Sequence, residues 1–343
     1  MGARSGGFRR SLGSQAAMGN ILEIEDLSLT LRGSDGKRLP VLEDLRLSLS
    51  KGECLGIAGE SGSGKSILAM TIMGLVPGAS ILERRGSVKF EGVELLGLSE
   101  DGFSKLRGNR MAMVFQEPMT SLNPLLTIGE QVGETIYAHQ SDLSAADVEG
   151  RVCAAMSRAG FSDPGAYLAS FPHQLSGGMR QRAMLAMSLV MEPDIIIADE
   201  PTTALDASLQ VQLLDQLRHG VKDGGHALIF ISHDLGVIRS IADRLAVLYA
   251  GFLVEEGPAA AVLEHPAHPY SAALTAALPR LTVEHRLPRS IPGHLPSPDK
   301  KPSGCVFSDR CVKAQRVCHE TVPMSREVGR NRRARCLFPE TVE

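Results

Sequence analysis

Hydrophobic and polar residues alternate between residues 21 and 50, most clearly in Leu27-Ser-Leu29-Thr-Leu31 and in Leu45-Arg-Leu47-Ser-Leu49. Successive side chains of a β-strand point to opposite faces, so this alternation predicts strands that are buried on one face. The segment from Gly33 to Gly36 separates the two stretches and predicts a turn. We therefore expect a half-buried antiparallel sheet in this part of the chain.

Three shorter stretches are apolar without alternation: 54–58, 195–198 and 227–231. Strands that are covered on both faces have this pattern, so these stretches predict a parallel sheet. A helix is expected after the first of them, to about Leu75, and strand, loop and helix in this order are typical of an α/β core. Residues from about 117 to 178 carry several helical signals and predict a helical insertion. Residues 247–255, centred on Ala250-Gly251, predict a hairpin.

Composition and charge limit the possible partners. The chain has 343 residues, of which 43% are hydrophobic and 22% charged, and its formal net charge is −3. It lacks the strongly basic character with which nucleic-acid binders displace counterions, so we expect no nucleic acid as a partner. No apolar run approaches the roughly 18 to 20 residues that span a bilayer, so any membrane function has to involve another subunit.

The two ends of the chain differ in composition from the middle. The first 19 residues contain three arginines among glycine, serine and alanine, without the apolar region of a secretion signal. We expect a disordered tail there, and Met18 is an alternative start. From about residue 263 onward prolines and histidines are frequent, and four of the six cysteines occur. The expected organisation is a tail at 1–19, a main domain at 20–262 and a small extension at 263–343.

A glycine-rich segment between the first apolar strand and its helix carries the first candidate chemistry. Gly59-Glu60-Ser61-Gly62-Ser63-Gly64-Lys65-Ser66 fits the phosphate-loop pattern G-x-x-x-x-G-K-[ST]. Its glycines allow backbone amides to wrap phosphates, and Lys65 would contact the outer phosphates. The Ser66 hydroxyl is a candidate ligand of Mg²⁺. A flexible glycine turn with a solvated lysine is the alternative.

Polar residues that follow the apolar strands are the next candidates. Asp199 and Glu200 end one strand, His233 follows another, and Gln116 comes directly after Phe115. Ligands of open α/β folds gather at the carboxyl edge of the sheet. There Asp199 would hold Mg²⁺, often through water, and Glu200 would orient and deprotonate the attacking water. His233 is a candidate sensor of the γ-phosphate, and Gln116 a candidate contact of the metal or of that water.

A second glycine-rich turn occurs in the octad Leu175-Ser-Gly-Gly-Met-Arg-Gln-Arg182. Ser176 is a favourable N-cap residue, Gly177 and Gly178 leave room for a ligand, and apolar residues then recur at helical spacing. The N-terminus of a helix attracts anions, so Ser176, Gly177 and Gly178 are candidates for a γ-phosphate contact. An ordinary capped helix is the alternative.

The order of these motifs resembles that of the ATP-binding-cassette (ABC) ATPases: phosphate loop, Gln116, octad, Asp199-Glu200, Ala204-Leu205-Asp206 and His233. The resemblance covers about residues 21–262. It implies an ABC-type α/β fold with a parallel core sheet that carries the phosphate loop, an antiparallel β subdomain and a helical insertion. It also implies that two domains bind head to tail, so that the octad of one closes over the ATP of the other, with Asp206 in the loop between the two sites. The sequence departs from the family at Leu31, where many relatives stack an aromatic ring on adenine.

Two further segments, 115–124 and 265–271, resemble the ATPases of dipeptide, oligopeptide and nickel importers. This resemblance implies a bacterial subunit at the cytoplasmic face of the inner membrane that hydrolyses ATP to import short peptides. Its partners would be two transmembrane permease subunits, a second ATPase that is a copy of itself or a related chain, and indirectly a substrate-binding protein. Import of nickel or glutathione is the close alternative. A soluble ABC protein without a transport role, or a regulatory iron–sulfur protein, is more distant.

Four cysteines of the extension have the spacing C-x5-C-x6-C-x17-C: Cys305, Cys311, Cys318 and Cys336. Nucleotide chemistry in the cytosol argues against disulfides, and the C-x2-4-C pair with which zinc sites usually begin is missing. The importer ATPases that the chain resembles carry a 4Fe-4S cluster in this extension, which these four thiolates would hold. Zinc and free thiols remain alternatives. We expect Cys54 and Cys153 to be structural.

Overall fold

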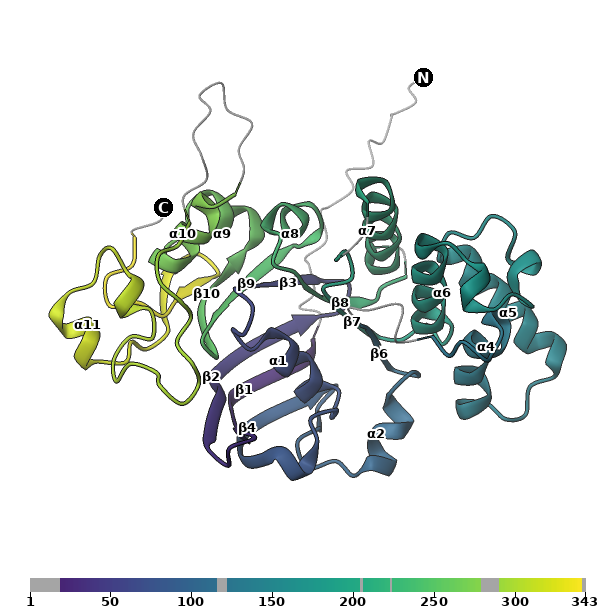
Figure 1. Cartoon of the computed structure of the whole chain (residues 1–343), viewed down its shortest axis with the longest axis horizontal. Helices are drawn as coiled ribbons and strands as arrows, with labels where there is room; N and C mark the ends of the chain where they lie inside the picture. The colour runs from purple at the N-terminus through teal and green to yellow at the C-terminus, as the bar shows by residue number, and fades with distance from the viewer. Residues whose placement is uncertain (1–18, 116–121, 204–205, 223, 279–289, 341–343) are drawn as a thin grey trace, which may run out of the picture.

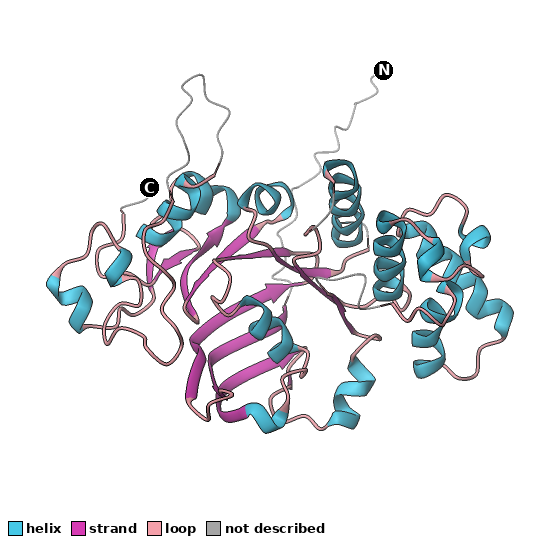
Figure 2. Ribbon diagram, viewed as in Figure 1, coloured by secondary structure: helices cyan, strands magenta, loops and turns pink. Residues whose placement is uncertain are grey.

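The computed structural model describes residues 19–115, 122–203, 206–222, 224–278 and 290–340. Two β-sheets form its centre, and helices cover the larger sheet (Figure 1). A group of helices lies at one end of the molecule and the C-terminal extension at the other (Figures 1 and 2). The glycine-rich segment 59–66 leads into helix α1 (Lys65–Ile72), which lies between these two ends (Figure 1).

The smaller sheet is antiparallel, with the strand order β2-β1-β4-β5. Its strands are β1 (Asn20–Arg32), β2 (Arg38–Ser50), β4 (Ile81–Phe90) and β5 (Val93–Glu94). Leu27, Leu29, Leu45 and Leu49 are all at most 2% exposed, and each comes from the alternating pattern. The predicted antiparallel sheet is therefore confirmed, since one face of β1 and β2 is buried and the other is largely exposed.

The larger sheet has eight strands in the order β11-β12-β10-β9-β3-β8-β7-β6. Its parallel part consists of β3 (Cys54–Ala58), β6 (Met111–Val114), β7 (Ile195–Asp199), β8 (Ala227–Ile231) and β9 (Arg244–Tyr249). The strand β10 (Phe252–Pro258) forms the predicted hairpin with β9. All residues of β3, β7 and β8 are buried, as a parallel sheet covered on both faces requires.

Helices on the two faces of this sheet belong to separate parts of the core. Helix α1 (Lys65–Ile72) packs between the two sheets, where Leu68 and Ile72 share a hydrophobic cluster with Ile197. Helices α7 (Ala207–Lys222) and α8 (Leu235–Ile241) cover the opposite face, where Ile196 faces them. Alternate residues of β7 therefore enter different clusters, as the period of two of a strand dictates.

The expected helical insertion is present among the described residues. It contains α4 (Ile128–His139), α5 (Ala145–Arg158) and α6 (Gly177–Leu189), with single 3-10 turns at Pro164–Tyr167 and Pro172–Gln174. Thr127 and Glu130 form a reciprocal capping box at the start of α4. The shorter helix α2 (Glu100–Leu106) and a 3-10 turn at Gly78–Ser80 lie beside the antiparallel sheet.

The C-terminal part of the chain continues the larger sheet. After α9 (Ala259–Glu264) and α10 (Pro269–Ala276) come a 3-10 turn (Ser308–Arg310), α11 (Arg316–Glu320), β11 (Arg326–Gly329) and β12 (Arg332–Ala334). Strand β12 pairs with β10, and Arg332 donates a 2.8 Å hydrogen bond to the fully buried Glu255 carboxylate. The arginine-rich sequence of this hairpin carries no strand pattern. Its strands form because β12 pairs with β10 at the edge of the larger sheet.

Candidate nucleotide-binding site

The phosphate loop connects β3 to α1 through backbone conformations that require glycine. Gly59, Gly62 and Gly64 have φ values of 153°, 81° and 109°. A Cβ atom at Gly59 would lie 2.2 Å from the Leu248 carbonyl oxygen, which leaves no room for a side chain. The loop is thus held against the neighbouring strand, and α1 begins at Lys65 with no side-chain cap on its first amides. Uncapped amides at a helix N-terminus favour an anion.

Lys65 is buried inside this loop, with only 5% of its surface exposed. Its Nζ donates hydrogen bonds to the carbonyl oxygens of Gly59 at 2.8 Å and Glu60 at 3.0 Å. Burial lowers the pKa of the Lys65 ammonium, and the nearby Glu200 and Asp199 carboxylates act in the opposite direction. A buried cation bonded to neutral carbonyls is a ready partner for a phosphate.

Asp199 ends β7 beside the start of α1 and is 6% exposed. Burial raises the pKa of its carboxyl group, while a hydrogen bond from the Ser66 hydroxyl lowers it. Within the described parts of the chain, Asp199 Oδ1 is buried and accepts no hydrogen bond. A buried carboxylate oxygen without a donor, next to a hydroxyl, fits a hard cation such as Mg²⁺, whose remaining ligands are usually water and phosphate oxygens.

Glu200 and His233 lie at the carboxyl ends of two neighbouring strands. The Glu200 N–H donates to the Ile231 carbonyl at 2.9 Å, which joins the end of β7 to the end of β8. Glu200 Oε2 accepts a hydrogen bond from the Thr203 hydroxyl at 3.1 Å and lies 3.1 Å from His233 Nδ1. The carboxylate side chain is 18% exposed and the imidazole 63%. The structure therefore brings together two predicted residues that are 33 positions apart in the sequence.

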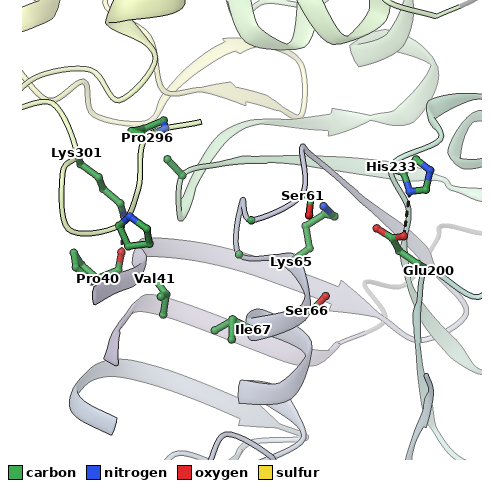
Figure 3. Close-up of a pocket in the computed structure, with 14 residues that line it drawn as sticks. Pro40, Val41, Ser61, Lys65, Ser66, Ile67, Glu200, His233, Pro296 and Lys301 are labelled. Atoms are coloured by element: carbon green, nitrogen blue, oxygen red, sulfur yellow. Dashed lines mark hydrogen bonds and ion pairs between the residues drawn. The ribbon is translucent and has the colours of Figure 1, made fainter. Parts of the chain in front are cut away.

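A cavity of about 310 Å³ connects these groups (Figure 3). Lys65 and Ser66 lie in its middle, with Glu200 and His233 on one side and Lys301 and Pro296 on the other. Its lining consists of Pro40, Val41, Ser61, Gly62, Gly64, Lys65, Ser66, Ile67, Glu200, His233, Ala250, Pro296, Pro298 and Lys301. Gln116, predicted as a contact of the metal or water, lies outside the described residues, as do Ala204 and Leu205.

The octad begins α6, as its sequence predicts, and lies away from this cavity. Ser176 caps the helix by accepting a hydrogen bond from the Met179 N–H at 3.4 Å. Ser176 and Gly177 are exposed, whereas Gly178 is buried. Gly178 packs so closely against Leu209 that a Cβ atom would lie 2.7 Å from that side chain. None of the three glycine-turn residues lines the cavity of its own chain. The start of α6 therefore does not contribute to the cavity of its own chain.

The fold and the sequence both match known proteins. Residues 42–203 match the family "ABC transporter" and residues 254–318 the family "Oligopeptide/dipeptide transporter, C-terminal region". The chain is 40% identical, over 93% of its length and 97% of the relative's, to the "Probable D,D-dipeptide transport ATP-binding protein DdpD" of Escherichia coli strain K12. It belongs to the ATP-binding proteins of ABC transporters. Its core is therefore an ABC ATPase domain.

Other comparisons agree with this membership. The oligopeptide transport ATP-binding protein AppD of Bacillus subtilis strain 168 is 38% identical over 94% of this chain and 98% of its own. A bacterial ABC transporter cassette, MJ0796, superimposes with a TM-score of 0.62 at 28% identity, covering 69% of this chain and 98% of the cassette. That cassette was solved as a dimer, and also in a post-hydrolysis state bound to ADP and Pi. The described helices include none long and apolar enough to cross a membrane.

The sequence did not predict several residues that line the cavity around Lys65. Leu31, considered as the position opposite adenine, does not line it, whereas Pro40 and Val41 of β2 do. Pro296, Pro298 and Lys301 reach it from the C-terminal extension. The sequence showed only that proline is frequent in the extension. That frequency does not indicate that these residues contact a loop more than 200 residues earlier in the chain.

The four cysteines of the extension line one small cavity together with Phe307 and Phe338. All are free thiols, and burial raises the pKa of Cys305 to about 11, with smaller contributions from the other three thiols. Within the described ranges, however, no group of three or more His, Cys, Asp or Glu side chains is arranged to hold a metal ion. The chemistry of the donors suits a four-thiolate centre, but their arrangement is not that of a completed ligand set.

Cys54 and Cys153 are free thiols of the ABC domain. Cys54 is 2% exposed on β3, where burial raises its pKa, and it belongs to the main hydrophobic cluster. Cys153 lies on α5, and burial raises its pKa as well. A thiol with a raised pKa is a poor nucleophile, so both positions favour a structural role.

Proposed function

We propose that this chain is the ATP-hydrolysing subunit that energises the import of short peptides through an ABC transporter. The observation that carries the proposal is the 3.1 Å contact between Glu200 and His233, at one side of the cavity whose centre holds the buried Lys65. The peptide cargo is supported by relatives that match this chain over nearly their whole length and are named for dipeptide or oligopeptide transport. Nickel and glutathione, the alternative cargoes, have no such support.

The residues in and around the cavity would have separate roles in ATP hydrolysis. Lys65 and the loop amides would bind the β- and γ-phosphates, and Ser66, Asp199 and Gln116 would hold Mg²⁺. A bound Mg²⁺ neutralises charge on the phosphates. Glu200 would accept a proton from the attacking water. His233, whose Nδ1 lies 3.1 Å from Glu200 Oε2, would orient that carboxylate or sense the γ-phosphate by donating to it. The Thr203 hydroxyl, 3.1 Å from Glu200 Oε2, supports the same orientation.

The exposed start of α6 supports a two-subunit arrangement. Ser176, Gly177 and Gly178 would contact the γ-phosphate held by a second ATPase subunit, either a copy of this chain or a related one, because they lie outside the cavity of their own chain. Asp206, which caps α7 by accepting a 2.9 Å hydrogen bond from the Leu209 N–H, would lie between the two sites. The remaining partners would be two transmembrane permeases and, indirectly, a substrate-binding protein, with this subunit at the cytoplasmic face of the bacterial inner membrane.

The extension at 263–343, appended to an ABC domain at 20–262, is proposed to hold a 4Fe-4S cluster. Cys305, Cys311, Cys318 and Cys336 would be its ligands, because four thiolates are the usual donors of such a cluster and all four thiols border one cavity. When bound, the cluster would supply a rigid link among segments that have little regular structure. Zinc and four free thiols are the alternatives to the cluster.

Hydrolysis by the complete transporter tests the proposed function. Reconstituted with its permeases, the parent protein should hydrolyse MgATP, and short peptides with their binding protein should stimulate it. Glu200→Gln should retain ATP binding and lose hydrolysis by about 10² to 10⁴-fold, the usual contribution of a general base. Glu264→Gln, at an exposed carboxylate paired with Arg239, is the matched control and should behave as the parent.

Two outcomes would contradict the proposal in different ways. Hydrolysis by Glu200→Gln at the parental rate would remove Glu200 from the role of general base. Stimulation by Ni²⁺ or by glutathione, without stimulation by peptides, would show that the cargo is not a peptide.

A further inference from the structure

Arg310, next to Cys311 in the extension, reaches the phosphate loop. Its side chain is 6% exposed, and its two terminal nitrogens lie 3.0 Å from the two carboxylate oxygens of Glu60. Nη1 also donates to the Tyr249 hydroxyl at 3.1 Å. A two-point contact between guanidinium and carboxylate fixes the direction of both groups more strongly than a single ion pair does. The second residue of the phosphate loop is therefore held by a residue 250 positions later in the chain.

The backbone of Glu60 is held from the same side. Its N–H donates to the Tyr270 hydroxyl at 2.9 Å, and Tyr270 is fully buried. Tyr270 packs with Tyr249 and Phe307 at ring-centroid distances of 4.5 and 5.3 Å. This aromatic cluster joins β9, α10 and the cysteine-containing loop. Both the amide and the carboxylate of Glu60 are thus positioned by parts of the chain that follow the core strands.

Glu60 in turn contacts the lysine of the phosphate loop. The Glu60 carbonyl accepts one of the two hydrogen bonds of Lys65 Nζ, at 3.0 Å. The Ser63 N–H donates to the same carbonyl at 3.1 Å. A displacement of Glu60 would therefore change both the position of the buried ammonium and the curvature of the loop that wraps the phosphates.

Arg310 also holds the segment that forms one wall of the cavity. Its Nε donates to the Pro292 carbonyl at 2.8 Å. From there the chain continues past Pro296 and Pro298, which line the cavity, to Lys301. Lys301 Nζ donates to the Pro40 carbonyl at 2.7 Å and to the Glu43 carboxylate at 2.6 Å, which ties this segment to β2.

The residues at the two sides of the cavity suggest how a nucleotide would be oriented in it. Glu200 and His233 lie at the side where the γ-phosphate would be, and Lys65 lies in the centre (Figure 3). A nucleotide bound along this line would extend its ribose and base toward Pro296 and Lys301, which lie on the opposite side of the cavity. Pro296 and Pro298 offer an apolar surface on this wall, in a chain that has Leu31 where many relatives stack an aromatic ring on adenine.

We propose that Arg310 is a positioning residue of the nucleotide site, which orients the phosphate loop through Glu60 and holds Pro296 and Pro298 against the base. The proposal rests on the proposed function, since it requires that the cavity binds ATP. It makes the extension part of the ATP site of its own chain.

Equilibrium binding to the full-length chain tests both contacts of Arg310. We expect Arg310→Gln and Glu60→Gln each to weaken MgATP binding by about 10-fold, within the usual range of coupling between linked groups. The double variant should also lose about 10-fold rather than about 100-fold, because the second substitution removes a contact that is already broken. Arg316→Gln, at an arginine of the same extension that is 92% exposed, is the matched control.

Inorganic tripolyphosphate separates the two contacts, because it lacks ribose and base. Its affinity should fall in Arg310→Gln, which acts on the phosphate loop, and stay unchanged in Pro296→Gly, which acts on the base wall. MgATP binding should weaken in both. Melting temperature is measured alongside, and Arg310→Lys, which keeps the charge without the two-point contact, should give an intermediate affinity if Arg310→Gln does not fold.

Each result either supports the proposal or overturns it. Additive losses in the double variant would show that Arg310 does not orient the phosphate loop through Glu60. MgATP affinity in Arg310→Gln equal to that of Arg316→Gln would show that Arg310 does not position the site. A parent chain that bound neither MgATP nor tripolyphosphate would instead contradict the proposed function itself.

Discussion

At the scale of single residues, several polar side chains of the site are buried in surroundings that leave them poorly compensated. Lys65 is buried against carbonyls, and Asp199 keeps one buried oxygen without a donor. Burial of either group costs free energy when it has no partner of opposite charge. A phosphate next to Lys65 or a cation next to Asp199 would offset that cost. Burial likewise raises the pKa of Cys305, Cys311 and Cys336, and a thiol in such a place loses its proton more readily when a metal binds the sulfur.

Metal content tests the cysteines directly. Chain purified without oxygen should contain about four iron atoms per protein and absorb visible light, since four thiolates are the usual ligands of a 4Fe-4S cluster. Cys311→Ser should lose the iron, whereas Cys153→Ser, at a free thiol of α5, should keep it. One zinc per chain, or no metal, would contradict the proposed cluster.

At the scale of elements, the ends of helices connect the sequence to the site. Ser176 caps α6, and His268 caps α10 by accepting a 3.0 Å hydrogen bond from the Tyr270 N–H at its Nδ1. The His268 N–H in turn donates to Glu255, which is paired with Arg332 of the added hairpin. His268 belongs to the 265–271 segment, and the structure places it at the proline-containing start of a helix. Tyr270, which contacts Glu60, is positioned by this cap.

The cap of α10 predicts how stability depends on pH. Burial lowers the pKa of His268 from 6.5 to about 3, so its stabilising contribution is complete above pH 6.5 and is lost as the pH falls toward 3. Between about pH 7 and pH 5 the parent should lose about 2 kcal/mol of unfolding free energy from this group, as the two pKa values imply. His268→Asn keeps a capping oxygen and should not show this loss.

Urea unfolding at both pH values measures the effect. His219→Asn, at an exposed histidine of α7, is the control and should retain the pH dependence of the parent. An unchanged dependence in His268→Asn would mean that another group causes the acid sensitivity.

At the scale of the whole molecule, the extension is a structural part of the ATPase. Its hairpin adds two strands to the core sheet, Lys301 pairs with Glu43, and Arg335 Nη2 lies 2.6 Å from the Asp44 carboxylate. The extension therefore contacts both sheets and the cavity between them. Helix α6 lies in the group of helices at the opposite end of the molecule, and the cassette to which the chain is similar was solved as a dimer.

Association of two subunits should depend on the start of α6. In the Glu200→Gln background, MgATP should convert the chain into a dimer with itself or with its related subunit. Adding Ser176→Arg should abolish the dimer, because a bulky cation would occupy the phosphate contact, while the ATP affinity of each single chain stays unchanged.

Light scattering and binding measurements together make the test. Ala146→Arg introduces the same charge at an exposed position of α5 and should leave the dimer intact. A dimer that survives Ser176→Arg would exclude the octad from the interface.

The sequence by itself determined the local parts of this protein. Alternation placed β1 and β2, apolar runs placed β3, β7 and β8, and the glycines and the capping serine placed the phosphate loop and α6. These features are local because side-chain period, positive φ and helix capping depend on residues a few positions apart. The order of the motifs was enough to indicate the ABC family.

Only the tertiary structure decided how distant segments complete the site. It placed Glu200 beside His233, Arg310 on Glu60, and two prolines of the extension on the wall of the cavity. It also showed that Pro40 and Val41, and not Leu31, are the residues of the antiparallel sheet that line the cavity. Such contacts depend on how sheets and loops pack across hundreds of residues. A periodicity or a short motif carries no information about them, because the energy that selects them arises only when the chain is folded.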